Sequence, residues 1–579
     1  MSVFKVMPHH SVTLHGILGD RLHKTVVNRL LKIHYPHLVD VYRYHSETDN
    51  LWRCEFWGKI VRSAIWCFHT EKNPELEQVI RATVEDMIST QSADGCISAY
   101  PPELQLSGWD IWGRKYVMIA LLRYYEELDH SERVKEVLIR MLDHLIVQLG
   151  EKELREFGCH SGLAACSILG AVVGVYRISG EKRFLDFAAS IVRSGCCTLH
   201  NIFEEIRKGR PVSELSNGKA YEMMSCFQGL ADYCNYDPRE EYKEAVLRFF
   251  EAVRTQEIFI TGGGGSLDGV GEFWYNGRYN QTRSDVGAMG ETCVTVTYMH
   301  LCNAVLGMTE LPCAAAEFFN SFCNALLGAV RFDGRFWCHG NPTPLAAGSS
   351  KIPAIDQIAF QGAEPFHGHD CCLAQGPEGI ALAALNAVMR TPEGIVLHYF
   401  EEMEIDLSCL SGKRGYLKLQ SSYPFSGRVD CIFQLSEPIE FELKLLIPFW
   451  QPENLKISVN GEIMSGEPGK YFAVKRVWHD GDRIEFELDF SLRKEISPDG
   501  KYTAFLAGPL VMSRDSRLSD INAPVPTDLQ YEECPPDEWN KIFLIRKLSD
   551  GSKLCDYISA GSFFQPGNLL RVWLEERKV

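Results

Sequence analysis

The spacing of the hydrophobic residues changes about two thirds of the way along the chain. From about residue 20 to 395 the apolar positions follow a helical period, and residues 116–125 are apolar enough for a helix buried on most sides. After about residue 396 the period is two: Phe441, Leu443 and Leu445 alternate with charged residues. This alternation is typical of antiparallel strands with one buried face. The pattern therefore predicts a helical part followed by a β-sandwich.

A weak internal repeat runs through the helical part. Tyr125, Tyr176 and Tyr233 each end an apolar run, and a polar turn and a second apolar run follow each of them at intervals of 51 and 57 residues. This period suits one helical hairpin per repeat, as in a solenoid or a closed ring, and about six hairpins fit the segment. We predict an (α/α)6 toroid. In the β part, Asn460-Gly461 predicts a type I′ hairpin.

These patterns divide the chain into four segments. Residues 1–19 are expected to form a strand segment that joins the sandwich, and residues 20–395 the (α/α)6 barrel. Residues 396–515 are expected to form the β-sandwich, and residues 516–579 a C-terminal β extension. No linker rich in proline, glycine or serine separates them, so we expect the parts to pack rigidly.

Composition and charge exclude several classes of protein. The 579 residues are 45% hydrophobic and 23% charged, with a net charge of −17 that argues against nucleic acid or an anionic membrane as a partner. No run of 18 or more apolar residues predicts a membrane span, and residues 1–10 lack the apolar core of a secretory signal. We therefore expect a cytoplasmic protein whose 20 cysteines are reduced thiols.

The strongest chemical signal is Glu291-Thr292-Cys293, which Cys371-Cys372 follows about 80 residues later. Three thiols and a carboxylate can close a tetrahedral zinc site, and thiolate ligands suit zinc better than magnesium or calcium. Residues two apart point about 200° apart within a helix, so Glu291 and Cys293 can share a metal only at a helix start. Gly290 and the apolar run after Cys293 favour such a start. The alternative is an acid that stabilises the helix dipole, followed by a core cysteine.

Cys371 and Cys372 lie where a loop is expected to lead into a helix, which becomes evident from Glu378 onward. Irregular backbone there would let both thiols face one metal, and a helix N-terminus would lower a thiol pKa. His369 and its neighbours His367 and Asp370 are candidates for further ligands or for contacts with substrate. The alternative is a pair of structural thiols.

A run of glycines, residues 262–265, precedes Glu272. The run lacks the Lys-Ser/Thr of a phosphate-binding P-loop, and no βαβ pattern surrounds it, so we discount nucleotide binding. Flexible glycines beside a free carboxylate instead suit a loop folded over a pocket.

Taken together, these segments resemble glycoside hydrolase family 127 and its relatives, the zinc-dependent β-L-arabinofuranosidases. The resemblance rests on residues 261–265, 271–273, 291–293 and 371–372, in that order. Weaker matches extend it along the chain: Asp333-Gly334, Asn341-Pro342, and residues 447–450, 459–461, 478–482 and 507–511. The order of these motifs is more specific than any one of them.

The resemblance implies an (α/α)6 barrel backed by β-sandwich material and a retaining, double-displacement mechanism. Matched residue by residue, Glu291, Cys293, Cys371 and Cys372 would bind Zn²⁺. Cys371 would be the nucleophile and Glu272 the general acid/base. The aromatic residues 273–275 would raise the pKa of Glu272 by desolvation.

Two departures from the family pattern concern the sugar. The family's Cys-Cys-Pro-Pro-Asn reads Cys-Cys-Leu-Ala-Gln at residues 371–375, and not all of the expected sugar-binding histidines are evident. The candidates for substrate contacts are therefore His160, Trp112, Arg114, Tyr221 and His369. Arg114 and the adjacent lysine are either helix-surface charges or ligands of an acidic sugar.

We predict a cytoplasmic retaining exo-glycosidase that acts on small oligosaccharides or glycosides containing an L-arabinofuranose-like sugar. One alternative keeps the mechanism and changes the sugar to an acidic or deoxy sugar of pectin. Another is a carbohydrate-binding protein with a structural zinc ion. The sandwich is expected to buttress the barrel, and a homodimer formed through it is left open.

Overall fold

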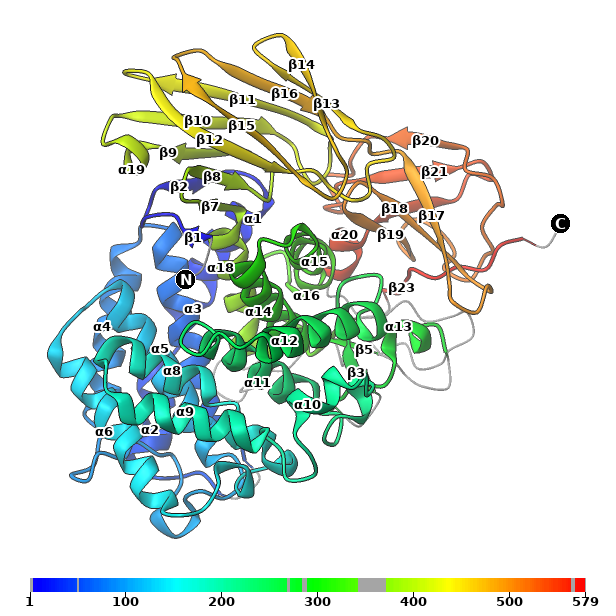
Figure 1. Ribbon diagram of the computed structural model, residues 1–579. Coiled ribbons are helices and arrows are strands. Elements are labelled where there is room, and N and C mark those ends of the chain that lie inside the picture. The colour runs from blue at the N-terminus through cyan, green and yellow to red at the C-terminus, as the bar shows by residue number, and fades with distance from the viewer. Residues whose placement is uncertain are drawn as a thin grey trace.

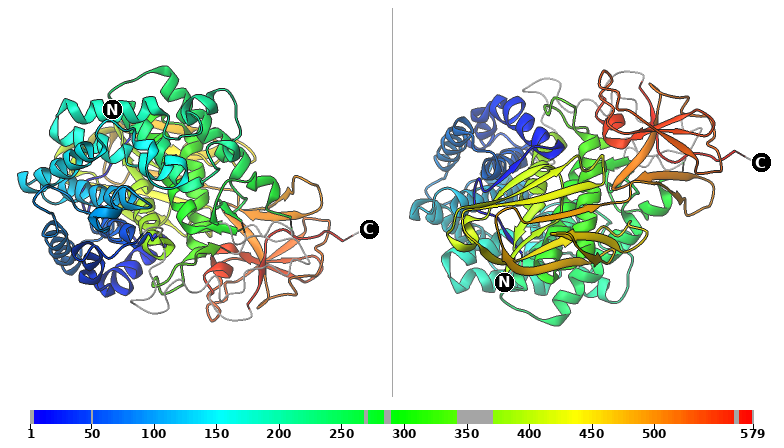
Figure 2. Two further views of the ribbon diagram at one scale, coloured as in Figure 1. Left: turned by 90° about the horizontal axis from the view of Figure 1, so that it is seen from below. Right: turned by 90° about the horizontal axis from the view of Figure 1, so that it is seen from above.

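The computed structural model describes residues 4–48, 51–267, 271–283, 289–341, 371–563 and 568–577. Helices form the N-terminal part, and antiparallel strands form most of the C-terminal part (Figure 1). This arrangement confirms the predicted fold class, an (α/α)6 barrel followed by antiparallel β-sandwich material. Both views in Figure 2 place the last strands (red) to one side of the barrel, whereas the sheets drawn in yellow cover one of its faces.

The three helical hairpins predicted from the repeat are confirmed. Their bounds are α5 (Asp110–Glu127) with α6 (Glu132–Leu149), α8 (Leu169–Ser179) with α9 (Lys182–Ser194), and α11 (Ala220–Tyr233) with α12 (Glu240–Ala252). The polar turns supply the caps: Ser131 accepts a hydrogen bond from the Val134 N–H at the start of α6. Gly180 ends α8 in the left-handed conformation that glycine adopts without strain.

Five helices, most of whose side chains are buried, surround the candidate site. They are α3 (Phe56–Thr70), α5, α11, α14 (Thr292–Thr309) and α18 (Cys371–Ala387). In α3 and α18 nearly every side chain is buried, because neighbouring helices cover both of their faces. The few polar residues on these helices are therefore conspicuous, and most of the candidate site residues are among them.

The sandwich contains a five-stranded and a seven-stranded sheet. In the first, β12 (Ile439–Leu446) pairs with β8 (Gly394–Leu397) and β15 (Tyr471–Trp478). The second includes β13 (Leu455–Val459) and β14 (Glu462–Gly466), joined by the predicted Asn460-Gly461 turn. Both turn residues have positive φ, at 53° and 87°, which confirms the type I′ hairpin.

The N-terminal strands belong to these two sheets. β1 (Lys5–Val6) pairs with β7 (Val388–Arg390), and β2 (Val12–Leu14) pairs with β9 (Met403–Asp406). The chain thus starts in the sandwich, forms the barrel and returns. A further sheet has β17 (Leu492–Ile496) at one edge and β20 (Tyr531–Cys534) at the other.

Within the part of the chain that the structure describes, one helical stretch, His160–Ser179, is long and apolar enough to cross a membrane by those two criteria alone. Of its 18-residue window, 72% is buried inside the protein, as is also found for core helices of soluble proteins.

A buried ionic network ties three of the inner helices together. Glu378 on α18 accepts a hydrogen bond of 2.7 Å from Arg62 on α3, and it also contacts His300 on α14. Burial alone would raise the pKa of Glu378, but the charges of Arg62 and His300 outweigh it and lower the pKa to about 2. The network therefore holds the helices that carry the candidate metal ligands at fixed distances.

We expect Glu378→Gln to lower the free energy of unfolding by about 3 kcal/mol near neutral pH. Because the pKa of this acid is lower in the folded state, its contribution is complete above pH 4.5 and is lost as the pH falls toward 2. Thermal unfolding across this range should show the variant and the wild type converging in acid. Glu393→Gln, which breaks an exposed pair with Lys475, is the control that should change little. A constant difference at every pH would contradict the assignment.

Candidate active site

A small four-stranded sheet brings the acidic residues of the site together. Its strands are β4 (Gly271–Glu272), β3 (Gly265–Leu267), β5 (Met289–Glu291) and β6 (Gly340–Asn341), in that order. Glu272 ends β4, Glu291 ends β5 and pairs with Gly340, and His339 directly precedes β6. Side chains from three distant parts of the sequence therefore lie at one place.

The glycine run that leads into this sheet lets the backbone approach neighbouring helices closely. Gly265 has φ +74°, and a Cβ atom there would lie 2.7 Å from a methyl carbon of Val294 on α14. Gly262 has φ +79°, and its Cβ would lie 2.5 Å from the Ser321 backbone. The glycines are thus held against helices, which differs from the flexible loop over a pocket that the sequence suggested.

Glu291 and Cys293 lie at a helix start, as the sequence predicts. Glu291 is the N-cap of α14, with extended backbone at φ −89° and ψ 134°, and its side chain makes no capping hydrogen bond. Both side chains are fully buried. Because the Glu291 carboxylate faces the cysteines instead of the helix end, the alternative of an acid that only stabilises the helix dipole is not supported.

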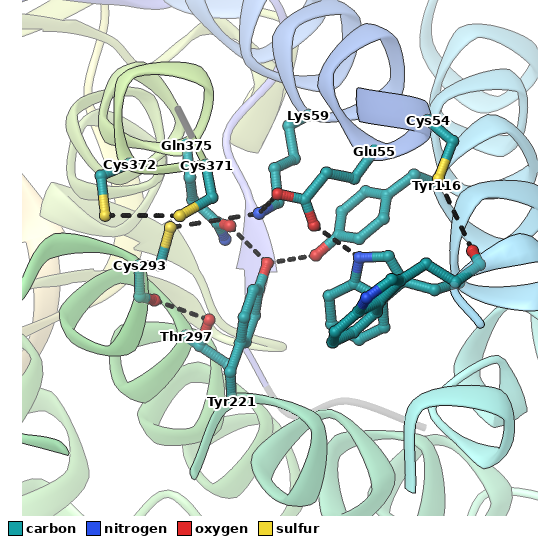
Figure 3. A network of polar contacts seen from close by, with 12 residues as sticks. Cys54, Glu55, Lys59, Tyr116, Tyr221, Cys293, Thr297, Cys371, Cys372 and Gln375 are labelled. Atoms are coloured by element: carbon teal, nitrogen blue, oxygen red, sulfur yellow. Dashed lines mark hydrogen bonds and ion pairs between the residues drawn. The ribbon is translucent and has the colours of Figure 1, made fainter. Parts of the chain in front are cut away.

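The sulfur atoms of Cys371 and Cys372 lie 3.8 Å apart (Figure 3). Glu291 Oε1 is 3.9 Å from Cys371 Sγ and 3.7 Å from Cys372 Sγ. Both cysteines belong to α18, which includes residues well before Glu378, where the sequence first indicates a helix. Neighbours on a helix differ by only about 100°, so their side chains converge without irregular backbone, and that expectation is wrong.

His339 was missed by the sequence analysis. Its Nδ1 lies 3.6 Å from Cys372 Sγ, and its Nε2 lies 3.9 Å from Glu291 Oε1. The sequence held a weak signal, since His339 lies two residues before the Asn341-Pro342 pair that was matched to the family. The histidine expected nearby, His369, lies outside the described residues.

These side chains form two overlapping groups whose ligand atoms lie within 4.8 Å of one another. One group is Glu291, His339, Cys371 and Cys372; the other is Glu272, Glu291, Cys293 and Cys371. A tetrahedral ion bound to thiolate at about 2.3 Å would separate two sulfurs by about 3.8 Å, as observed for Cys371 and Cys372.

The environment of Glu291 also fits a cation. Its Oε2 is buried and makes no hydrogen bond within the described structure. Burial and the nearby charge of Glu272 raise the pKa of Glu291 well above its ordinary value. A bound cation would remove this penalty, so the donor set fits a metal ion.

The three thiols differ in acidity. Hydrogen bonds from Cys293 and Cys372 lower the pKa of Cys371 well below its ordinary value, whereas burial raises the pKa of the other two thiols. Negative charge therefore concentrates on Cys371. Lys59 adds a fully buried ammonium 2.8 Å from Glu55 and 4.0 Å from Cys293 Sγ, where it stabilises thiolate charge (Figure 3).

Glu272 forms an ion pair of 2.7 Å with Lys219. Burial acts to raise the pKa of Glu272, but Lys219 outweighs it and holds the pKa below its ordinary value. The raised pKa expected from the aromatic neighbours is therefore wrong for the free protein. Glu222 lies 4.0 Å from the same ammonium, and burial raises its pKa to about 7.

A pocket of about 220 Å³ opens onto these groups. This volume is below the roughly 300–1,000 Å³ of sites for drug-sized ligands, so it suits a small ligand. Its lining combines aromatic and ionisable side chains: Trp52, Glu55, Trp109, Trp112, Lys219, Tyr221, Glu222, Glu272, Glu291, His339 and Cys371. The predicted contacts Trp112 and Tyr221 are among them. Trp112 donates to Glu55, and Tyr221 donates to Gln375.

The two other predicted substrate contacts that the structure describes, His160 and Arg114, do not line the pocket. His160 packs 5.4 Å from the Trp109 ring, at the edge of the pocket, and burial lowers its pKa to about 4. Arg114 is buried away from the pocket in an ion pair of 2.7 Å with Asp110. The structure thus brings the carboxylates and thiols together and leaves Arg114 out.

Two protein-family models match most of the chain. A family model described as the GH127 β-L-arabinofuranosidase catalytic domain matches residues 13–384, and a GH127 middle-domain model matches residues 394–490. A search of curated proteins finds no match.

Several solved structures share the whole fold. A GH127 β-L-arabinofuranosidase from Geobacillus stearothermophilus T6 is 15% identical, with a TM-score of 0.76, and the match covers 98% of this chain and 100% of that one. A GH127 β-arabinofuranosidase is 16% identical, with a TM-score of 0.78 and coverages of 100% and 98%. A further glycoside hydrolase is 17% identical, with a TM-score of 0.76 and the same coverages. Because the catalytic-domain model matches more than half of the chain, the protein belongs to the GH127 family of glycoside hydrolases, the β-L-arabinofuranosidases.

Proposed function

We propose that the protein is a zinc-dependent, retaining exo-glycosidase that releases an L-arabinofuranose-like sugar from small oligosaccharides or glycosides. The observation that carries the proposal is that a thiol of low pKa, Cys371, and a carboxylate, Glu272, line one small pocket beside a metal-donor set. Neither a structural zinc site nor a simple binding site needs both groups there.

Zinc is the ion that suits this donor set. Glu291, Cys293, Cys371 and Cys372, each a member of one or both donor groups, would hold it, and thiolate ligands favour zinc over magnesium or calcium. When bound, zinc supplies positive charge that keeps the cysteines as thiolates near neutral pH. The Lys59 ammonium, 4.0 Å from Cys293 Sγ, also stabilises the thiolate form.

The residues of the chain then carry out two displacements. The sulfur lone pair of Cys371 forms a bond to the anomeric carbon as the glycosidic C–O bond breaks, and Glu272 gives its proton to the departing oxygen. Glu272 next takes a proton from water, which displaces the sulfur. The ligand atoms of Glu272 and Cys371 lie within 4.8 Å. This upper limit is shorter than the roughly 6.5–9.5 Å that leaves room for the water of an inverting enzyme.

The lining of the pocket favours a neutral sugar. The described residues that line it carry four carboxylates, those of Glu55, Glu222, Glu272 and Glu291, and one ammonium, that of Lys219. Among the described residues, neither Arg114 nor Lys115 lines it. An acidic sugar would therefore meet repulsion from these carboxylates, and Lys219 is already paired with Glu272, so L-arabinofuranose is favoured over an acidic pectic sugar.

We expect Lys219→Met to move the alkaline limb of the pH profile of kcat/KM to higher pH. The general acid must be protonated, and Lys219 lowers its pKa, so removing this charge raises the pKa of Glu272 and extends activity upward. Lys219→Arg keeps the charge and should leave the limb in place. An unchanged limb in Lys219→Met would show that Glu272 does not set it.

The proposal is tested by hydrolysis of p-nitrophenyl β-L-arabinofuranoside, with the bound metal quantified in the same preparations. We expect turnover, one zinc per chain, and NMR detection of the β-anomer as the first product. A metal-free protein purified under reducing conditions without chelator would overturn the zinc assignment. Zinc without turnover would overturn the choice of sugar.

A further inference from the structure

Apart from Glu272, the proposed acid/base, the two donor groups contain one more donor than a tetrahedral ion needs. The family resemblance accounts for Glu291 and the three cysteines. His339 is a fifth candidate, and it belongs to one of the two overlapping donor groups together with Glu291, Cys371 and Cys372. No role in the proposed reaction has yet been given to it.

The position of His339 matches that of a metal ligand. With a metal–sulfur distance of about 2.3 Å and a metal–nitrogen distance of about 2.0–2.1 Å, tetrahedral geometry separates sulfur and nitrogen by about 3.5–3.6 Å. His339 Nδ1 lies 3.6 Å from Cys372 Sγ. The Cys371–Cys372 sulfur separation, 3.8 Å, fits the same ion. One ion could therefore meet the nitrogen and both sulfurs.

His339 also lies on the substrate side of the donor set. Its side chain is 29% exposed and lines the pocket, as does Cys371, whereas Cys293 and Cys372 are fully buried. Among the three cysteines and His339, the donors that line the pocket are thus the proposed nucleophile and His339, and Glu291 lines it beside them. If Cys371 withdrew from the ion, the coordination position that it left would lie near the imidazole of His339.

We propose that His339 is an exchangeable ligand of the metal, which takes the position that Cys371 leaves when its sulfur is bonded to the sugar. This inference rests on the proposed function of the same site. Without such an exchange, Cys371 would have to serve as a metal ligand and as the nucleophile at the same time. Both roles use electron density on the same sulfur atom.

The exchange balances in atoms and electrons. In the first displacement Cys371 passes from thiolate to thioether, a weak ligand, and the electron pair of the broken C–O bond leaves with the oxygen, which Glu272 protonates. A nitrogen lone pair of the His339 imidazole would then be available to hold the ion. When water displaces the sulfur in the second displacement, the thiolate returns and His339 withdraws. No oxidant or reductant is required.

The test uses Cys371→Ala as a permanent substitute for the state in which sulfur is withdrawn. Zinc affinity is measured by chelator competition for the wild type, His339→Gln, Cys371→Ala and the double variant. We expect His339→Gln to weaken zinc binding by about 10- to 100-fold in the Cys371→Ala background, as is typical when a group that supports a metal site is lost. In the wild-type background the effect should be small.

X-ray absorption at the zinc edge gives a second readout that does not depend on activity. Relative to the wild type, Cys371→Ala should lose one sulfur and gain the outer-shell scattering of an imidazole, and the double variant should lose that scattering. Cys371→Ala with His160→Gln is the matched control, since His160 lies at the pocket edge and outside both donor groups. It should behave like Cys371→Ala alone.

Equal zinc affinity and no imidazole scattering in Cys371→Ala, with or without His339, would overturn the inference. If the double variant fails to fold, the scattering of Cys371→Ala alone still decides it. Failure of the proposed function would look different, because the wild type would then bind no zinc or Cys371→Ala would remain active. Zinc binding with an inactive Cys371→Ala and no imidazole signal would overturn only the role of His339.

Discussion

Replacing Cys371 by serine is expected to lower kcat/KM for an arabinofuranoside by about 10⁴-fold or more, because it removes the nucleophile of the first displacement. Hydrogen bonds from Cys293 and Cys372 lower the pKa of the Cys371 thiol well below its ordinary value, so this sulfur is the most easily ionised of the three. A serine hydroxyl, in contrast, does not ionise near neutral pH and is a weaker nucleophile. The measurement is steady-state hydrolysis of a nitrophenyl arabinofuranoside, with zinc determined on the same samples.

Two other cysteine variants separate the nucleophile from the ligands. Cys371→Ser should retain zinc, because Glu291, Cys293, Cys372 and His339 remain as donors. Cys293→Ser should lower activity and weaken zinc binding, because it removes a fully buried thiol and leaves an ion to be held by Glu291, His339, Cys372 and the nucleophile itself. Cys409→Ser, on a short helix of the sandwich, should lose neither. If Cys371→Ser kept activity within tenfold of the wild type, another group would have to be the nucleophile.

The architecture was predictable because long periodic segments and local turn chemistry determine it. The repeat of Tyr125, Tyr176 and Tyr233 marked three real hairpins, and Asn460-Gly461 marked a real type I′ turn. The helix start at Glu291 was also predictable, because a glycine precedes it and an apolar run follows. In each case the deciding interactions lie within a few residues of one another.

The electrostatics of the pocket could not be predicted in the same way. Lys219 comes to Glu272 through an isolated bridge between its own backbone and that of Phe273, a contact that no local pattern reveals. Lys59 reaches Cys293 across more than 230 residues of sequence. Arg114 pairs with Asp110 one helical turn before it, and both side chains are buried, so neither a helix-surface charge nor a sugar ligand describes it.

Replacing Glu272 by glutamine is expected to slow the second displacement more than the first for a nitrophenyl substrate. Nitrophenolate leaves without strong protonation, so the first step survives, whereas water is no longer deprotonated and turnover falls by about 10²- to 10⁴-fold. The enzyme should therefore release a burst of nitrophenol and accumulate a covalent sugar on Cys371. Intact-protein and peptide mass spectrometry would detect one anhydropentose unit at that residue.

Azide should rescue the Glu272→Gln variant, because it attacks without needing a base, and the glycosyl azide should keep the configuration of the substrate. Glu222→Gln, a change to another buried carboxyl of the same pocket, should give neither burst nor rescue. An azide product of inverted configuration would mean a single displacement. That outcome would require room for azide between Cys371 and the sugar, yet the ligand atoms of Cys371 and Glu272 lie within 4.8 Å, less than the roughly 6.5–9.5 Å that inversion needs.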